Sequence, residues 1–224
     1  MNVQFPSLLL GTRNAGKVRE IETILADVPW ELRSLRDFDT VAVPPETAPT
    51  YAGNAMIKAR FYARETGLCA LADDSGLEVE ALDGAPGVLS ARYAGEGASD
   101  ADRRALLLSE LARVGKESAR ESDRSARFVC AVAIATPDGE VLNVSEGVCP
   151  GTIIFEPRGT NGFGYDPLFV PEGFDQTFAK LSDTVKNRIS HRARALLKTR
   201  TFLLSSTQLD APQSAQLDQQ TSDS

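Results

Sequence analysis

The chain is predicted to fold as a mixed α/β domain in which helices flank a twisted β-sheet. Along its 224 residues, segments with an apolar residue at every second position alternate with segments of helical period. The 42% hydrophobic content supports a sizeable core. A turn signal, TPDG at 136–139, separates two β-rich runs and predicts an antiparallel hairpin. We expect one domain over residues 1–205 and a disordered polar tail at 206–224, which has few large apolar groups.

Seven segments are predicted to be strands from their apolar alternation or their continuous apolar runs. They are residues 7–11, 30–35, 69–72, 77–82, 126–136, 140–146 and 167–170. The segment 126–136 is apolar on both faces, with Phe128 on one face and Val129 on the other. We therefore expect this strand to lie inside a sheet that is covered on both sides.

Four segments are predicted to be helices because their apolar residues recur with a helical period. They are residues 15–26, 51–66, 99–114 and 183–204. Ser182 is a suitable N-cap for the last helix, and Gly67 is a suitable C-terminal stop for the second.

The net charge of −7 argues against a protein that coats nucleic acid, because that function needs a broad basic face. Cys69, Cys130 and Cys149 lie far apart and form no C-x-x-C pair, so we expect small buried residues in a reducing compartment. No segment has the pattern of a signal peptide or the length of a membrane span. These features predict a soluble, cytoplasmic protein that binds neither membranes nor nucleic acids.

The segment GTRNAGKV, residues 11–18, has the composition of a phosphate-binding loop between a strand and a helix. Glycines let the backbone approach an anion, the first amides of the helix point at it, and Lys17 adds a positive charge. A Walker A loop has Ser or Thr directly after its lysine to hold magnesium, but this chain has Val18. Other residues must therefore hold a metal that accompanies a nucleotide. The alternative is an ordinary glycine-containing turn with a solvated lysine.

The segment LADDSGLEVEALDGAPGVLSARYAG, residues 71–95, supplies two adjacent carboxylates, Asp73 and Asp74. We expect them to end an apolar strand, with at least one projecting into a cleft built by loops. Adjacent carboxylates repel unless a cation or a raised pKa relieves them, and Mg²⁺ prefers oxygen ligands of this kind. Glu46, in a proline-rich loop, is a candidate third acid. The alternative is an ordinary polar turn between two strands.

The segment GTNGFGYDP, residues 159–167, displays Phe163 and Tyr165 between glycines. Such a loop can lay an aromatic face against a nucleobase. The alternative is a glycine-rich connection with an aromatic side chain in the core.

The segment SDTVKNRISHRARAL, residues 182–196, gathers cations and hydrogen-bond donors in an acidic protein. His191 is the only histidine, and without an evident orienting partner we favour base recognition over general-base catalysis for it. Arg192 follows directly. The alternative is a solvated basic helix face. On another predicted helix, Asn54 and Lys58 share one face at i, i+4.

Taken in order, GTRNAGK, LADDSGLEVEALDGAPGVLSARYAG, GFGYDP and the K-N-x-x-S-H-R run at 186–192 resemble the motifs of the inosine triphosphate pyrophosphatase family. Its members hydrolyse non-standard purine nucleoside triphosphates such as ITP, dITP and XTP. The resemblance extends from Leu9 to about Leu197, and the ordered set is specific although each motif alone is weak. It implies two lobes around a central nucleotide-binding cleft, Mg²⁺ as the cofactor and a homodimer.

The resemblance also implies roles for the residues at matching positions. Asp74 corresponds to a proton acceptor associated with the metal, Glu46 corresponds to a second metal-linked acid, and Asp73 is a further candidate ligand. The implied substrate contacts are Thr12, Arg13, Asn14, Ala15, Gly16, Lys17, Lys58 and Lys186 for the triphosphate segment, Ser75, and Phe163, Gly164, Tyr165, Asp166, His191 and Arg192 for the base. The chain departs from the commonest pattern at Gly53, where glutamate is frequent, and at residues 184–185, where acids are frequent.

The implied mechanism is metal-assisted hydrolysis, in which magnesium bridges the phosphates and the acids, water attacks, and a monophosphate and diphosphate leave. The division of roles between Asp73 and Asp74 stays open. A 6-oxo group accepts a hydrogen bond where the adenine amino group donates one, so His191 and Arg192 can favour inosine and xanthine. Two alternatives remain, a pyrophosphatase for other modified nucleotides and a nucleotide sensor without turnover, whereas Val18 disfavours a degenerate P-loop kinase.

Overall fold

A six-stranded sheet forms the centre of the computed structural model, which describes residues 6–38, 41–118 and 124–206. In space the strands follow the order β2-β1-β3-β4-β5-β6. They are β1 (Ser7–Leu10), β2 (Glu31–Ser34), β3 (Cys69–Val79), β4 (Ser125–Ala135), β5 (Val141–Ile153) and β6 (Phe169–Pro171). β1 is parallel to β2 and β3, and the remaining neighbours are antiparallel. The sheet is therefore mixed.

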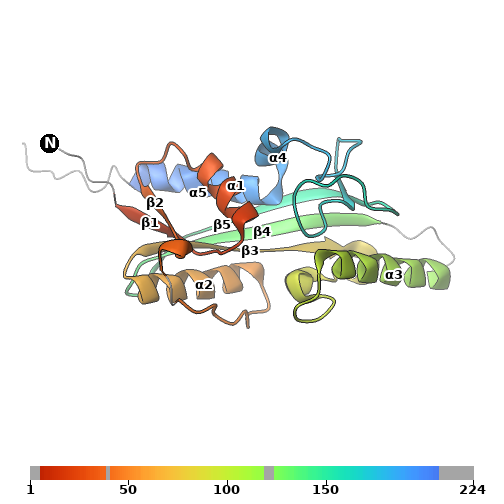
Figure 1. Cartoon of the computed structure of the whole chain (residues 1–224), viewed down its shortest axis with the longest axis horizontal. Helices are drawn as coiled ribbons and strands as arrows, with labels where there is room; N and C mark the ends of the chain where they lie inside the picture. Colours follow the sequence, from red (N-terminus) through yellow and green to blue (C-terminus); the bar gives the residue numbers. More distant parts are fainter. Residues whose placement is uncertain (1–5, 39–40, 119–123, 207–224) are drawn as a thin grey trace, which may run out of the picture.

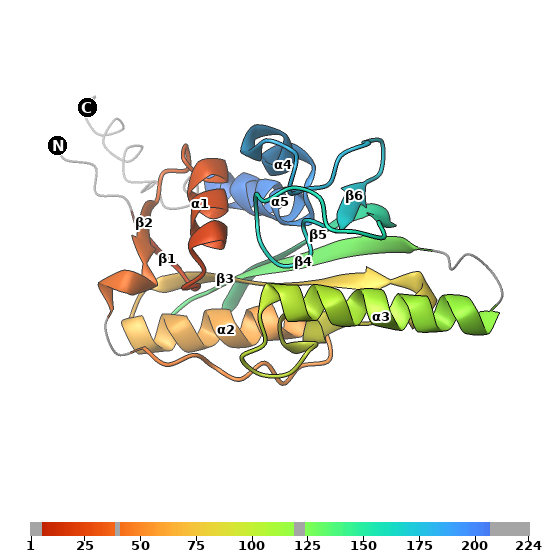
Figure 2. The same ribbon diagram turned by 45° about the vertical axis from the view of Figure 1, so that its right-hand side comes forward.

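Helices cover both faces of the sheet, which confirms the predicted fold class (Figure 1). They are α1 (Ala15–Ile24), α2 (Tyr51–Thr66), α3 (Asp100–Ser118), α4 (Asp183–Ile189) and α5 (His191–Ser206), with short 3-10 helices η1 (Leu35–Asp37), η2 (Glu80–Leu82) and η3 (Gly87–Arg92). The turned view shows α1, α4 and α5 on one face and α2 and α3 on the other (Figure 2). A ligand that binds at the edge of the sheet can therefore contact helices of both layers (Figure 2).

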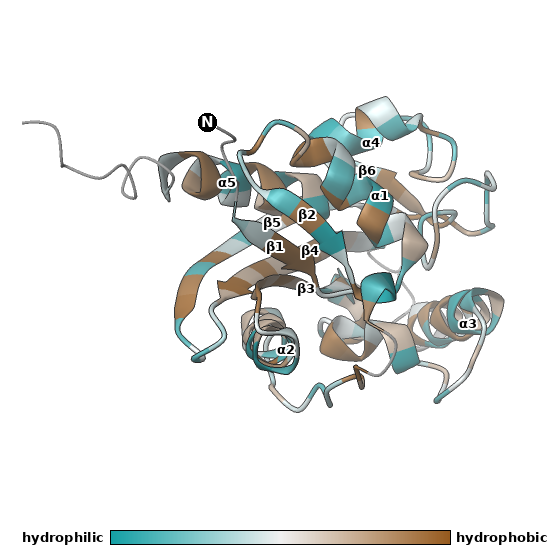
Figure 3. Cartoon of the chain, turned by 60° about the vertical axis from the view of Figure 1, so that its left-hand side comes forward, coloured by the Kyte–Doolittle hydropathy of each residue, from teal (hydrophilic) through white to brown (hydrophobic). Residues whose placement is uncertain are grey.

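The central strand β4 is covered on both faces, as predicted. Ala131 and Ala133 pack in the cluster beneath α2, whereas Cys130 and Val132 pack in the cluster that includes α1 and α5. Colouring by hydropathy shows this apolar centre between polar outer surfaces (Figure 3). The β4–β5 connection is the predicted antiparallel hairpin, closed by the bond from the Gly139 N–H to the Thr136 carbonyl at 3.0 Å.

β3 corrects one prediction, because the two strands expected at 69–72 and 77–82 are a single strand, β3. Asp73 and Asp74 do not end a strand; they lie in its middle, opposite Val132 and Ala131 of β4. Successive side chains of a strand point to opposite faces, so the two carboxylates face different layers. The final residues of the second predicted strand form η2.

The helix expected at 183–204 is also divided, because α4 ends at Ile189 and α5 begins at His191. Ser190 has an extended backbone, and its hydroxyl accepts a bond of 3.1 Å from the Ala193 N–H, so it caps the second helix. The predicted caps are confirmed: the Ser182 hydroxyl accepts from the Val185 N–H, and Gly67 ends α2 in the left-handed conformation at φ +69°.

All three cysteines are free thiols, as expected, although Cys69 is only half-buried. Burial raises the pKa of the Cys130 thiol to about 12, so this group is not a ready nucleophile.

Over the described residues, no helix combines the length and the apolar character that crossing a membrane requires. The predicted tail at 206–224 lies outside the described residues except for Ser206, the last residue of α5.

Candidate functional site

The loop between β1 and α1 is organised by Asn14, the N-cap of α1. The Asn14 Oδ1 accepts bonds from the N–H groups of Gly16 at 2.9 Å and Lys17 at 3.1 Å, and the Thr12 hydroxyl accepts from the Asn14 N–H at 3.2 Å. Ala15 is the first helical residue. Arg13 points elsewhere, because its guanidinium donates to the carbonyl of Val41 at 2.9 Å. The loop therefore directs Lys17, not Arg13, toward β3.

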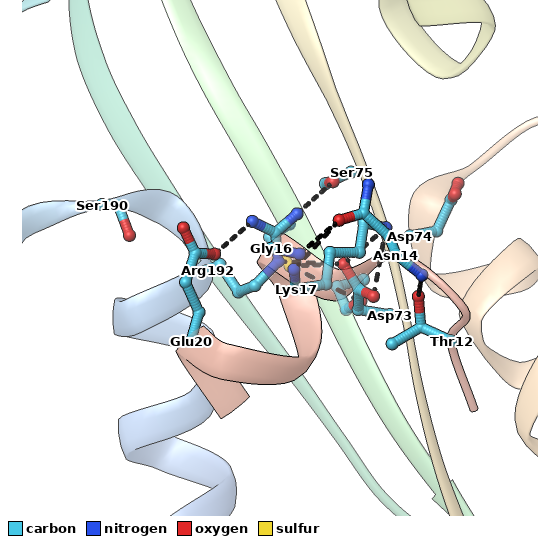
Figure 4. A network of polar contacts seen from close by, with 12 residues as sticks. Thr12, Asn14, Gly16, Lys17, Glu20, Asp73, Asp74, Ser75, Ser190 and Arg192 are labelled. Atoms are coloured by element: carbon cyan, nitrogen blue, oxygen red, sulfur yellow. Dashed lines mark hydrogen bonds and ion pairs between the residues drawn. The ribbon is translucent and has the colours of Figure 1, made fainter. Parts of the chain in front are cut away.

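Asp73 lies at the centre of a buried polar network (Figure 4). The Lys17 ammonium is 2.9 Å from its carboxylate, and the Arg192 Nε donates to it at 3.1 Å. Although burial opposes ionisation, Lys17 and Arg192 hold the pKa of Asp73 well below its usual range. Asp73 is thus a fixed anion that joins the start of α1 to the start of α5.

Asp74 faces the other layer, where α2 supplies its partners. The Lys58 ammonium lies 2.8 Å from one Asp74 oxygen, and the Asn54 amide donates to the other at 3.2 Å. The predicted shared face of Asn54 and Lys58 is therefore confirmed. Burial raises the pKa of Asp74 above its ordinary value, and Lys58 only partly opposes this.

Glu46 approaches the same lysine from the loop before α2. Its carboxylate is 2.9 Å from the Lys58 ammonium and 2.9 Å from the Arg92 guanidinium at the end of η3. Although partial burial opposes ionisation, these two cations lower the pKa of Glu46. Lys58 therefore stands as a cation between two carboxylates, one from β3 and one from the loop.

The loop that carries Glu46 is fastened to α2 by Asn54, whose Oδ1 accepts a bond of 2.9 Å from the Ala48 N–H. Gly53 permits this approach, because a Cβ added there would lie 2.6 Å from the Cβ of Ala48. A larger residue at position 53 would therefore displace the loop.

The donor set of Glu46 and Asp74 fits a small divalent cation. Two carboxylates already converge on one positive group, and Mg²⁺ commonly takes one or two carboxylates together with water and phosphate oxygens. Asp73 is not part of this set, because it faces the opposite layer and its oxygens are paired with Lys17 and Arg192. Among the residues that the structure describes, no group of three or more His, Cys, Asp or Glu side chains is placed to hold a metal.

Glu20 on α1 belongs to the site, although sequence patterns did not indicate it. Its carboxylate lies 2.7 Å from the Arg192 guanidinium (Figure 4). The same carboxylate lies 3.1 Å from the Lys186 ammonium, so Glu20 ties both cations to α1. The available signal was its position three residues after Lys17, on the same face of the helix.

A cavity of about 200 Å³ lies beside this network. Its walls include Asn14, Lys17, Ser75, Asp100, Arg103, Phe128, Phe163, Gly164, Tyr165, Asp166, Lys186, His191 and Arg192. The Phe163 ring has the Lys186 ammonium 5.0 Å from its centroid and the Arg192 guanidinium carbon 5.6 Å away. The cavity thus combines an aromatic face with cations, which suits a flat base that carries acceptor groups.

His191 is buried at the inner wall of this cavity. Its ring stacks on Phe128 with centroids 4.6 Å apart and planes 11° from parallel. Burial and the neighbouring cations hold the pKa of His191 well below its ordinary 6.5, so the imidazole is neutral. Its Nδ1 is buried and has no hydrogen-bond partner among the described residues. A neutral ring with an unpaired nitrogen at a cavity wall fits hydrogen bonding to a ligand.

Arg192 keeps part of its donor capacity for a ligand. Its guanidinium donates to Asp73, to Glu20 and to the Ser75 hydroxyl, the last at 2.9 Å. Guanidinium has five N–H donors, so about two stay free. Ser75 therefore lines the cavity and also orients the Arg192 guanidinium.

Tyr165 and Asp166 use their polar groups to hold the loop at residues 159–167 in place. Tyr165 is buried in the apolar core, and its hydroxyl donates to the Ser90 carbonyl at 3.1 Å. The Asp166 carboxylate accepts from the Phe163 N–H at 3.0 Å and pairs with the Lys186 ammonium at 2.7 Å. Of the two aromatic residues expected to be displayed, only Phe163 presents its ring beside the site cations.

Comparisons with known proteins agree on one group of relatives. The Ham1 family profile matches residues 8–202. A dITP/XTP pyrophosphatase of Desulfotalea psychrophila is 51% identical over 191 residues, which are 85% of this chain and 82% of that protein. One from Bacillus licheniformis is 49% identical over 88% of this chain and 97% of its own length. The HAM1 protein structure from Coxiella burnetii has a TM-score of 0.80 and 42% identity, covering 90% of this chain and all of that one (100%).

Proposed function

Since the chain belongs to the Ham1 family, we propose that it hydrolyses the non-standard purine nucleoside triphosphates ITP, dITP and XTP to the monophosphate and diphosphate. The curated relatives that share about half of its residues are named for dITP and XTP. The observation that carries the proposal is the cavity in which neutral His191 and cationic Arg192 and Lys186 meet the Phe163 ring. Beside it, β3 presents a carboxylate to each layer.

The two adjacent aspartates have different tasks in this proposal. Asp74 accepts the proton of the attacking water, because it lies beside Glu46 at the proposed cation site, whereas Asp73 is paired with Lys17 and Arg192. Asp73 stays ionised and holds Lys17 and Arg192 in place. The opposite environments of the two carboxylates, on two faces of one strand, support this division of roles.

Glu46 and Asp74 are the residues that would hold Mg²⁺. When bound, the ion would neutralise phosphate charge and polarise the phosphoanhydride that is cleaved. The cationic side chains of the site, Lys17, Lys58 and Lys186, now pair with internal carboxylates. Phosphate oxygens compete for these same ammonium groups, so substrate binding rearranges ion pairs that already exist.

Selection of the base follows from the donors at the cavity wall. The free N–H groups of Arg192 and a neutral His191 pair with the 6-oxo group of hypoxanthine or xanthine. Adenine presents an amino donor at this position and leaves those donors unpaired, which is costly in a buried site.

The proposal is tested by diphosphate release from ITP, dITP, XTP, GTP, ATP and dUTP with magnesium, with EDTA as the control. We expect ITP, dITP and XTP to turn over far faster than GTP and ATP, and EDTA to stop the reaction. Fast turnover of dUTP instead indicates a pyrophosphatase for other modified nucleotides. ITP binding without any diphosphate release indicates a sensor.

A homodimer in the cytoplasm completes the proposal. Apolar side chains of β5 support an interface: Val144 is 40% exposed and Val148 is 38% exposed, on the strand face that α5 does not cover. Sedimentation at micromolar concentration tests this state, and a monomer there contradicts it.

A further inference from the structure

Gly164, directly after Phe163, is held at both of its polar backbone atoms by side chains of α3. The Gly164 N–H donates to the Asp100 Oδ2 at 2.7 Å, and the Arg104 guanidinium donates to the Gly164 carbonyl at 2.7 Å. Neither residue was indicated by a sequence motif. Because charged groups make both bonds, they are stronger than ordinary peptide hydrogen bonds.

The start of α3 is built so that Asp100 and Arg104 point to the same place. Ser99 and Asp102 form a reciprocal cap: the Ser99 N–H donates to the Asp102 carboxylate at 3.0 Å, and the Asp102 N–H donates to the Ser99 hydroxyl at 3.2 Å. Asp100 and Arg104 are spaced at i, i+4, which puts both on one face of the helix. Arg103 pairs with the second oxygen of Asp100, so the carboxylate has little freedom to turn.

These contacts join the two layers beside the cavity. α3 lies on the opposite face of the sheet from α4 and α5, and the segment between β5 and α4 reaches toward the start of α3 (Figure 2). Asp100 and Gly164 both line the cavity. From the other layer, Asp166 holds the Phe163 N–H and Lys186 holds Asp166. Phe163 is therefore fixed from both sides of the site.

We propose that Asp100 and Arg104 are positioning residues for the nucleobase, which hold the Gly164 peptide and thereby keep the Phe163 ring against the base cavity. The inference rests on the proposed function, because it assigns the base to this cavity. Asp100 suits the task at neutral pH: although partial burial opposes ionisation, the Gly164 N–H and Arg103 keep its pKa below the ordinary value. The two residues touch the loop, not the phosphate-binding lysines.

The first test separates the two halves of the substrate. Calorimetry measures the affinity of Asp100→Ala and Arg104→Ala for inosine monophosphate, which has no bond that the enzyme would cleave, and for inorganic triphosphate, which has no base. We expect the Kd for inosine monophosphate to rise about tenfold, as for the loss of a charged hydrogen bond. The Kd for triphosphate should stay within about twofold. Equal weakening of both ligands, or of neither, overturns the positioning role.

Steady-state kinetics provide a second readout that a merely structural role would not move. In both alanine variants the KM for ITP should rise more than kcat falls. Arg104→Lys, which keeps one charged donor, should recover part of the lost affinity. Glu110→Ala is the matched control, because it removes an ion-paired carboxylate from the same helix without touching the loop. A kcat defect with unchanged KM contradicts the proposal.

Hydrogen exchange at the Gly164 amide tests the contact itself, independently of catalysis. Asp100→Ala should accelerate exchange at this amide, and Glu110→Ala should not. Wild-type turnover of ITP is measured first. Its absence contradicts the proposed function, and with it the base assignment on which the inference rests. Wild-type turnover with unchanged inosine monophosphate affinity in Asp100→Ala contradicts only the positioning role.

Discussion

At the scale of single residues, Asp73 and Asp74 differ more in their surroundings than any sequence pattern could indicate. Asp73 is bound by a cation from each end of the chain, Lys17 and Arg192, whereas Asp74 shares Lys58 with Glu46. Removing the charge of Asp73 should therefore have a different effect on the protein from removing the charge of Asp74.

Replacement of each aspartate by asparagine should separate catalysis from stability. Asp74→Asn should lower kcat for ITP by about 10² to 10⁴ with little change in Tm, because it removes the proton acceptor. Asp73→Asn should lower the free energy of unfolding by about 3 to 5 kcal/mol, because it leaves Lys17 and Arg192 buried without their shared anion. Turnover assays and urea unfolding of both variants check this, and the reverse pattern would exchange the two roles.

His191 should make stability depend on pH in a defined direction. Its pKa in the folded protein lies well below 6.5, so the unfolded chain binds the proton first as the pH falls. The contribution of neutral His191 is fully present above about pH 6.5 and is lost progressively as the pH falls below this value. We expect wild type to lose more stability than His191→Asn between pH 7.5 and pH 5 in denaturant titrations. Parallel losses in the two proteins would show that other groups cause the change.

At the scale of elements, the break between α4 and α5 places His191 and Arg192 at the cavity wall. Because Ser190 caps α5, His191 and Arg192 occupy its first turn and face the cavity, whereas Lys186 stays on α4. Close packing of β5 against this turn fixes its position: a Cβ added at Gly147 would lie 2.1 Å from the His191 carbonyl and 2.5 Å from the Ala195 nitrogen.

Gly147→Ala should therefore displace the start of α5. We expect a loss of about 1 to 3 kcal/mol in the free energy of unfolding, as for overpacked sites, together with a raised KM for ITP. Thr152→Ala, at another exposed position of β5, is the control and should leave both nearly unchanged. Thermal unfolding and steady-state kinetics measure the difference, and an unaltered KM in Gly147→Ala would show that the turn adapts without moving His191.

Sequence patterns located most of the site but not its geometry. The motifs that carry Lys17, Lys186, His191 and Arg192 come together around one cavity, because each segment carries its own turn and cap signals. The Asp-Asp-Ser-Gly run does not end a strand, although these residues favour turns locally, because pairing with β4 and the buried ion pairs keep them in β3.

The residues that patterns missed share a physical reason. Glu20 and Asp100 act through partners far away in sequence, Arg192 and Gly164, and no local periodicity reports such contacts. Ser190 was read as an ordinary position within one long helix, because a serine inside a helical pattern gives the same signal whether it caps a new helix or faces solvent.

At the scale of the whole molecule, the site joins the two layers of helices through the sheet. Lys58 comes from α2 below and Lys17 from α1 above, with β3 between them (Figure 1). A ligand that bridges the layers should stabilise the entire fold by mass action.

Removal of the metal should therefore weaken binding of the phosphate part of the substrate and leave binding of the base part unchanged. We expect diphosphate to raise Tm in the presence of magnesium and to lose this effect in EDTA, because Glu46 and Asp74 repel an unaccompanied polyanion. Inosine monophosphate should raise Tm to a similar extent with and without EDTA, since its base cavity contains no residue of the metal set. Differential scanning fluorimetry checks both, and metal-independent stabilisation by diphosphate would contradict the assignment of Glu46 and Asp74.

The ion pairs of Asp73 with both Lys17 and Arg192 also have a consequence for protein synthesis. Its two partners are separated by nearly the whole described chain, so a product that terminates before α5 keeps a buried anion with only Lys17 beside it. The same product lacks the helix that covers β4 and β5. Prematurely terminated chains should therefore fail to reach the native state and be degraded by cellular proteases, so that quality control leaves only full-length copies able to act on nucleotides.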